Sequence, residues 1–351
     1  ISVRLVGSEM CIRDSYSNKI NTFLLCLTFL IIGFSSWLML PIRANANVPV
    51  NENNPSSARE LLAYYNLEQY PKTHLFYGPQ FTDQYAGLDE NQPFTDDKPK
   101  YEKDLKNGKY VVVNDYKNAI QNYNSDHGSI LPRMWSTEHA SNYMRYSGFL
   151  GFSVKPEYKM QNEFQGLVDE FNKSVDEGTV DYDGYHNFLK TYGRYLDIQK
   201  PSILDNIYYL FEYQIGYMYW RYFMWNFSGR QDDIQGKMDL HGNWITGINF
   251  IDSFLLGITQ ENLPTDVLNN KARNSYYLLP FLLGLIGFLF VLKKDKKVFW
   301  TMLVFFLFTG VAIQVYTNVR PFEPRERDYS LVGSFYAVSY THLTLPTIDP
   351  V

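Results

Sequence analysis

Three arginines and three acidic residues crowd the segment Arg320–Tyr329, where they could bind a phosphate group. Guanidinium groups bind phosphate oxygens through paired hydrogen bonds, so Arg325 and Arg327 are the predicted ligands. Glu323 and Asp328 could orient them, and two prolines stiffen the loop. A charge-balanced segment beside a membrane explains the same residues equally well.

A second polar cluster lies in residues 225–244. Its members are Trp225, Asn226, Gly229, Arg230, Gln231, Asp232, Asp233, His241, Asn243 and Trp244. Neighbouring carboxylates beside an arginine could hold a divalent cation or act as a base, and tryptophan can stack on a pyranose ring. We predict that Arg230 and Asp232 bind substrate. A solvated helix end that stops at Gly229 is the simpler explanation.

The third cluster is the asparagine-rich segment 41–55. Amides both donate and accept hydrogen bonds, which suits sugar hydroxyls, and an arginine at a membrane surface suits a phosphate. Arg43, Asn45 and Asn47 are the predicted ligands. Asparagine and proline are also the usual residues of ordinary turns.

Other kinds of site find no support in the sequence. It has no GxSxG elbow, no phosphate-binding glycine loop and no HExxH motif, and His127 and His139 lack the spacing of metal ligands. Cys11 and Cys26 offer no disulfide framework. We therefore predict no cofactor, metal or catalytic residue, and the net charge of -5 argues against a nucleic-acid partner.

The elements that must position these clusters begin with three uncharged stretches, residues 20–40, 275–292 and 298–318. A helix of about 20 residues spans the roughly 30 Å of a bilayer's hydrocarbon core. We predict three transmembrane helices in a lipid bilayer. The first stretch is longer than the apolar part of a signal peptide, about 7 to 15 residues, although that alternative stays open.

The turn between the last two stretches sets the expected orientation. It contains four lysines in Lys293–Lys297. Short loops rich in lysine stay on the cytoplasmic side, so residues 41–274 should lie outside the cytoplasm. The arginines of the loop after residue 318 oppose this orientation, but acidic residues are interleaved with them.

An aromatic segment, residues 203–227, could overturn that layout if it crossed the membrane. Ser202 is a good helix cap, but Glu212 and Arg221 would each cost about 2.5 to 3.5 kcal/mol at the bilayer centre. We predict a helix that lies in the interface or packs beneath the outer domain. A polar outer segment would follow it as far as residue 274.

Residues 41–202 are predicted to form an extracytoplasmic α+β domain. The expected elements are a helix capped by Ser56 or Ser57, a short strand in 74–77, a hairpin in which 100–105 pairs with 109–116 about Asn107 and Gly108, and helices within 157–200.

Both ends of the sequence look foreign to the rest. Residues 1–15 and 338–351 resemble translated sequencing-adapter sequence, and we expect neither to belong to the natural chain. Between them, residues 319–337 would form the arginine-rich outer loop and the start of a further span, so the chain is expected to be a fragment.

Five segments together resemble one bacterial family of large multi-pass proteins catalogued as a domain of unknown function. They are residues 42–55, 74–81, 130–135, 213–236 and 320–337. That family is similar to animal transmembrane protein O-mannosyltransferases of the GT-C type. The resemblance implies an integral protein of the bacterial inner membrane whose periplasmic face transfers a sugar from a lipid-phosphate donor to a protein acceptor.

The same resemblance gives the three clusters a common role. The residues that would line the cleft for donor phosphate and acceptor are Arg43, Asn45, Asn47, Arg230, Asp232, Arg325 and Arg327. The family's presumed catalytic acid lies among earlier spans that nothing in this sequence matches, so no catalytic residue can be assigned. The alternative is a non-catalytic, membrane-anchored binding or surface-assembly protein.

Overall fold

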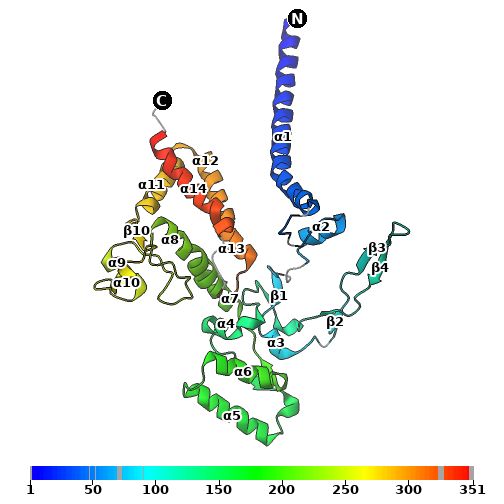
Figure 1. Ribbon diagram of the computed structural model, residues 1–351, viewed down its shortest axis with the longest axis vertical. Helices are drawn as coiled ribbons and strands as arrows, with labels where there is room; N and C mark the ends of the chain where they lie inside the picture. Colours follow the sequence, from blue (N-terminus) through cyan, green and yellow to red (C-terminus); the bar gives the residue numbers. More distant parts are fainter. Residues whose placement is uncertain are drawn as a thin grey trace. The chain divides into compact units, whose positions relative to one another are not determined.

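The computed structural model describes residues 2–46, 48–51, 53–68, 73–89, 91–322 and 328–347 (Figure 1). Those residues form helices and five separate two-stranded antiparallel sheets, so the predicted mixture of helices and small sheets is confirmed. The chain divides into two compact units, Ile1–Lys72 and Thr73–Val351, and each is described by itself.

The first unit contains a long helix, α1 (Ser2–Asn45), and a short one, α2 (Ala58–Tyr65). Its segment Asn18–Asn45 is long and apolar enough to cross a membrane. The helix continues past the expected boundary at residue 40, so Arg43 lies in a last helical turn and not in a loop. Ser57 caps α2 through a capping box with Glu60, as predicted.

The second unit begins with an α+β domain built on aromatic packing. Its strands pair as β1 (Tyr77–Pro79) with β6 (Gly128–Ile130) and β7 (Phe152–Val154) with β8 (Leu196–Ile198). Its α-helices are α3 (Asp83–Ala86), α4 (Ala140–Ser147), α5 (Asn162–Asp176) and α6 (Tyr182–Tyr192). Short 3-10 turns are η1 (Ser125–His127), η2 (Thr137–His139), η3 (Pro156–Tyr158) and η4 (Gly193–Tyr195). The predicted helices within 157–200 are therefore present.

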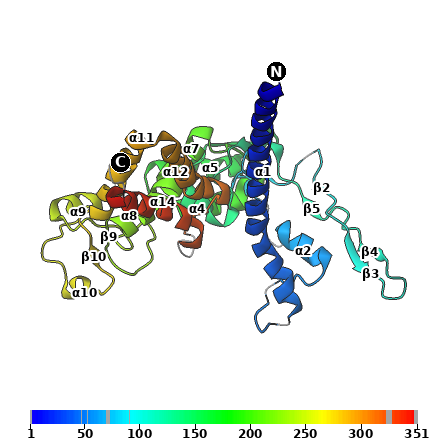
Figure 2. The same ribbon diagram turned by 90° about the horizontal axis from the view of Figure 1, so that it is seen from above.

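An arm of four short strands extends from this domain. β2 (Phe94–Thr95) pairs with β5 (Ile120–Gln121), and β3 (Lys100–Lys103) pairs with β4 (Tyr110–Asn114). The chain turns at Gly108, whose φ of 67° suits glycine. The predicted hairpin is confirmed, and in both Figure 1 and Figure 2 it forms a narrow ribbon.

The aromatic segment is one continuous helical stretch, as predicted. It consists of α7 (Ile203–Tyr209), a π-helix η5 (Leu210–Arg221) and α8 (Tyr222–Phe227). Ser202 caps it through a capping box with Asp205. Tyr209 and Tyr213 join the core of the α+β domain, whereas the rings of α8 pack against Phe281 and Phe335. The helix is packed among other elements of its unit.

The remaining elements follow this helix. They are β9 (Gly229–Arg230), α9 (Asn249–Leu256), α10 (Thr265–Leu268), β10 (Asn274–Ser275), α11 (Leu279–Lys294), α12 (Lys296–Thr309), α13 (Val311–Thr317) and α14 (Asp328–Thr347). Asp295 caps α12 by accepting hydrogen bonds from Lys297 N and Val298 N, which makes the turn after α11 tight.

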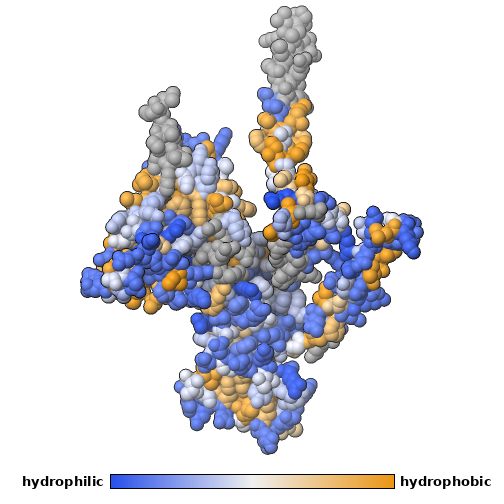
Figure 3. All heavy atoms as spheres, in the orientation of Figure 1, coloured by the Kyte–Doolittle hydropathy of each residue, from blue (hydrophilic) through white to orange (hydrophobic). Residues whose placement is uncertain are grey.

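Two helices, and not the expected three, are long and apolar enough to cross a membrane within the described part of the chain. They are Asn18–Asn45 and Lys296–Thr317. The expected span at 275–292 is wrong in its start, because Asn274 and Ser275 pair with β9 and the helix begins only at Leu279. The resulting α11 has 16 residues, slightly fewer than a typical span needs. Figure 3 shows apolar residues gathered over the helices at the C-terminal end of the chain and along α1.

Candidate functional site

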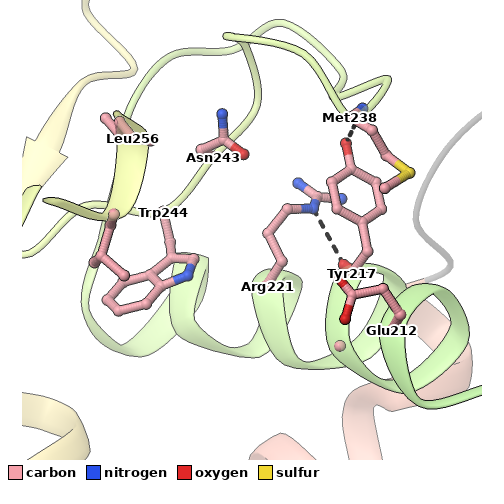
Figure 4. A pocket seen from close by; sticks show the side chains of 9 residues that line it. Glu212, Tyr217, Arg221, Met238, Asn243, Trp244 and Leu256 are labelled. Carbon is pink, nitrogen blue, oxygen red and sulfur yellow. Dashed lines mark hydrogen bonds between the residues drawn. The ribbon is translucent and has the colours of Figure 1, made fainter. Parts of the chain in front are cut away.

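A cavity of about 250 Å³ lies between η5 and the loop that covers it, residues 231–247. The residues around it that carry polar or aromatic groups are Glu212, Tyr217, Arg221, Asn243 and Trp244 (Figure 4). Leu255 and Leu256 of α9 add an apolar wall. Charged, amide and aromatic groups thus meet in one hollow, which is the usual composition of a small-molecule site.

The π-helix explains how Glu212, Tyr217 and Arg221 come to face the same cavity. In a π-helix the hydrogen bonds join residues five apart, and such stretches occur frequently at functional sites. Gly216 permits the geometry, because a β-carbon there would lie 2.9 Å from the carbonyl oxygen of Phe211. The sequence therefore uses a glycine where the helix widens.

Arg221 joins the floor of the cavity to its covering loop. Its side chain is buried, and its Nη1 donates a hydrogen bond to the carbonyl oxygen of Gly242. Its Nε donates to the carbonyl oxygen of Tyr217 at 3.2 Å, and the guanidinium carbon lies 4.4 Å from the centre of the Tyr217 ring. The phenol of Tyr217 in turn accepts a hydrogen bond from Met238 N at 2.7 Å.

Asp232 organises the same loop from inside. One carboxylate oxygen accepts from Gly242 N at 3.0 Å and Ile234 N at 3.1 Å, and the other pairs with His241 Nδ1 at 2.9 Å. The residue is 6% exposed. Its carboxylate therefore holds the loop in shape, and its predicted contact with substrate would have to be indirect.

The side chain of Arg230 contacts the end of α8. Its guanidinium carbon lies 4.5 Å from the centre of the Trp225 ring, and Nη2 donates to Asn226 Oδ1 at 3.3 Å. Its backbone belongs to β9, which pairs with β10. Of the seven predicted ligands, Arg230 and Asp232 are the pair that one loop brings together, but their side chains have different surroundings.

The other five predicted ligands lie in the first unit or outside the described residues. Arg43 and Asn45 belong to the first unit, where Asn45 Nδ2 donates to Pro41 O at 2.8 Å and Ser56 O at 3.2 Å. Asn47, Arg325 and Arg327 lie outside the described residues. That the clusters around Arg43, Arg230 and Arg325 line one cleft together stays a prediction.

Sequence reasoning missed Glu212, Tyr217 and Arg221 as site residues. It treated the two charges only as obstacles to membrane insertion. The available signal was a glutamate and an arginine in an otherwise aromatic segment, with Gly216 between them. Charges kept in such a segment need a partner or a function.

A second hollow, of about 460 Å³, lies in the α+β domain beside Asp83, Gln84 and Asn122. Burial raises the pKa of Asp83, although its carboxylate accepts a hydrogen bond from Asn124 N at 2.7 Å. The amides of Gln84 and Asn122 already donate to backbone carbonyl groups. The polar side chains of Asp83, Gln84 and Asn122 are therefore already engaged within the protein. No group of three or more metal-ligating side chains occurs among the described residues.

The loop over the cavity is expected to loosen as the pH rises. The hydrogen bond with Asp232 raises the pKa of His241 above its usual value near 6.5. A raised folded pKa means that the protonated imidazole stabilises the loop at low pH, and this stabilisation is lost as the pH passes through the raised value. The effect should be below about tenfold in amide protection, because the imidazole is 51% exposed.

Hydrogen exchange of residues 234–244 at pH 5.5 and pH 8, corrected for intrinsic rates, measures this effect. His241→Gln should give equal protection at both values. If the unsubstituted protein shows the same amide protection at pH 5.5 and pH 8, the pair of His241 and Asp232 does not control the loop.

Comparison with known proteins gives one match. Residues 71–211 match a family of unknown function, DUF8416. The predicted likeness to a family of unknown function is confirmed over these residues, which include the α+β domain and end one residue before Glu212. Searches of curated proteins and of solved structures found no match.

Proposed function

We propose that this protein is held at a membrane and binds a saccharide in the cavity at η5. The observation that carries the proposal is the position of Trp244 beside Asn243, Arg221 and Glu212 around one hollow (Figure 4). An indole offers an apolar face to the C–H groups of a pyranose, and the neighbouring amide and charged groups suit hydroxyls. The volume of about 250 Å³ lies just below the roughly 300 to 1,000 Å³ of usual ligand pockets, so we propose no more than one sugar unit for it.

Attachment to a membrane is supported by the two apolar helices, Asn18–Asn45 and Lys296–Thr317, which have the length and composition of spans. The lysine-rich turn Lys293–Lys297 would lie in the cytoplasm by the positive-inside rule. In a bacterial cell the α+β domain would then face the periplasm. This orientation is part of the proposal.

Trp244→Ala is expected to weaken saccharide binding by about tenfold or more, because aromatic anchors dominate such sites. The probe is an immobilised array of hexoses, N-acetylhexosamines and their oligomers, incubated with the full chain in detergent micelles. Trp220→Ala is the matched control, since Trp220 belongs to η5, beside the cavity, but stacks on Phe223 and does not line the cavity.

Two outcomes of this experiment would contradict the proposal. One is that the unsubstituted protein retains no glycan at millimolar ligand. The other is that Trp244→Ala and Trp220→Ala reduce retention equally, since a general loss of stability would then explain both.

Sugar transfer is the second candidate function, and Glu212 favours it. Among the described residues no hydrogen bond or ion pair engages this carboxylate, which lines the cavity from an exposed position. A free carboxylate beside a bound sugar could act as a general base toward an acceptor hydroxyl. The resemblance to O-mannosyltransferases supports a lipid-phosphate sugar donor and a protein acceptor. Release of lipid phosphate from a synthetic lipid-phosphate mannose by the purified chain would separate transfer from binding alone.

A further inference from the structure

The β3–β4 hairpin exposes apolar side chains that nothing else in the described structure covers. All nine residues of the two strands are exposed. The valines of β4 are about half exposed, at 48% for Val111, 52% for Val112 and 53% for Val113. Figure 3 shows apolar residues on this arm beside charged ones.

A two-stranded ribbon of this kind has little stability of its own. An isolated two-stranded hairpin is at best marginally stable in water, because it buries little surface. In the described sheets β4 pairs only with β3, so the outer edge of β4 carries backbone N–H and C=O groups that no described strand pairs. An exposed, apolar strand edge of this kind invites pairing with a further strand.

The two outer edges of the hairpin differ in how many charged residues they carry. β3 carries Lys100, Glu102 and Lys103 within its four residues, and charges along an edge discourage pairing. β4 has no charge between Tyr110 and Asn114. The open edge is therefore that of β4.

The sequence around β4 is complementary to itself in the antiparallel direction. An antiparallel pairing centred on Val112 places Val111 opposite Val113 and Tyr110 opposite Asn114. One residue beyond the strand at each end, Lys109 lies opposite Asp115 of the second strand. Because of the two-fold symmetry, this ion pair would form twice.

Other alignments lose that complementarity. A parallel pairing would set Lys109 against Lys109 and Asp115 against Asp115, and like charges directly opposite are destabilising. An antiparallel pairing centred on Val111 puts both charges opposite uncharged residues, and one centred on Val113 sets Lys109 against Lys117. Asp115 is free to exchange partners, since its present pair with Lys117, at 3.5 Å, is well exposed.

We infer that β4 pairs with β4 of a second copy of this chain, antiparallel about Val112, to form a four-stranded sheet across a two-fold axis. The partner at the open edge is a second copy of the chain, because Lys109 and Asp115, which flank β4, are complementary to Asp115 and Lys109 of another β4. This inference is independent of the saccharide cavity.

A symmetric cross-link tests the register. In a background with Cys11 and Cys26 replaced by serine, Val112→Cys should form an intermolecular disulfide in the full chain in micelles. Directly opposed antiparallel residues have Cα atoms about 4.5 to 5.5 Å apart, within the range that a disulfide spans. Leu105→Cys is the matched control, because Leu105 is 92% exposed in the same hairpin but lies away from the axis.

A charge exchange tests the pairing itself by sedimentation. Lys109→Asp should raise the dimer dissociation constant by about tenfold or more, since it sets two acidic residues opposite each other at both ends. Adding Asp115→Lys to the same chain should restore dimerisation. Faster cross-linking at Leu105→Cys than at Val112→Cys would overturn the register. A monomer at all concentrations, or a double variant that dimerises no better than Lys109→Asp, would overturn the inference.

Discussion

Replacement of Asn206 by alanine should lower the free energy of unfolding by about 3 kcal/mol, because it leaves buried amide groups unpaired. Asn206 is 0% exposed, and its Oδ1 accepts hydrogen bonds from Arg133 N at 2.7 Å and Met134 N at 3.2 Å. Its Nδ2 donates to Ser202 O at 2.9 Å and Gln80 Oε1 at 3.2 Å. An unpaired buried N–H costs about 1 to 3 kcal/mol, and two would be created.

Thermal or denaturant unfolding of the full chain in micelles measures the change. Asn187→Ala is the control, because Asn187 is exposed on α6 and should alter stability by no more than about 0.5 kcal/mol. A loss in Asn206→Ala no larger than in the control would show that water or a rearranged backbone satisfies the freed groups.

Asn206 matters because it belongs to a polar network that joins three parts of the second unit. Asn318 Nδ2 donates to Pro132 O at 2.9 Å, and Trp135 Nε1 donates to Asn318 O at 2.9 Å. Gln214 of η5 donates to Asn318 Oδ1 at 3.0 Å and to Val319 O at 2.8 Å. The helix that carries the cavity is thereby fixed to the loop before α4 and to the end of α13.

The sequence predicted elements well where a local signal was decisive. Asn107 and Gly108 marked the hairpin because a tight turn needs φ values that glycine adopts readily. Ser57 and Ser202 marked two helix starts because their side chains satisfy the first unpaired N–H groups. Such signals depend only on neighbouring residues.

Features that depend on distant residues could not be predicted in the same way. The shortened α11 results from pairing of Asn274 and Ser275 with β9, more than 40 residues earlier in the chain. The carboxylate of Asp232 turns inward because Gly242 N, ten residues later, meets it. Composition identified the cluster around Asp232 but not the direction of its side chains.

The cavity depends on the π-helix η5, which the residue pattern of this segment did not predict. Regular α-helical spacing would not bring Glu212, Tyr217 and Arg221 to one hollow together, since residues nine apart are rotated by about half a turn from one another at 3.6 residues per turn. The wider π-helix changes that relation, and Gly216 allows it. Sequence periodicity alone predicts an α-helix here.

Arg221→Met should weaken saccharide binding by about tenfold or more and lower the free energy of unfolding by about 1 to 3 kcal/mol. Methionine keeps much of the side chain's length but cannot donate a hydrogen bond, so the carbonyl oxygen of Gly242 loses this partner. Arg221→Lys should recover part of both losses, because it restores a charge without the planar fork of the guanidinium. Arg145→Met, at an exposed position on α4, is the control.

Two measurements on the same samples separate binding from loop support. If Arg221 contacts the sugar, saturating ligand should protect residues 238–244 from hydrogen exchange in the unsubstituted protein but not in Arg221→Met. If Arg221 only supports the loop, exchange in Arg221→Met will be fast without ligand, and enough ligand will restore protection to the level of the unsubstituted protein. The second result would leave Trp244 and Asn243 as the groups that recognise the sugar and would make Arg221 a positioning residue, since its hydrogen bond to Gly242 then acts only through the loop.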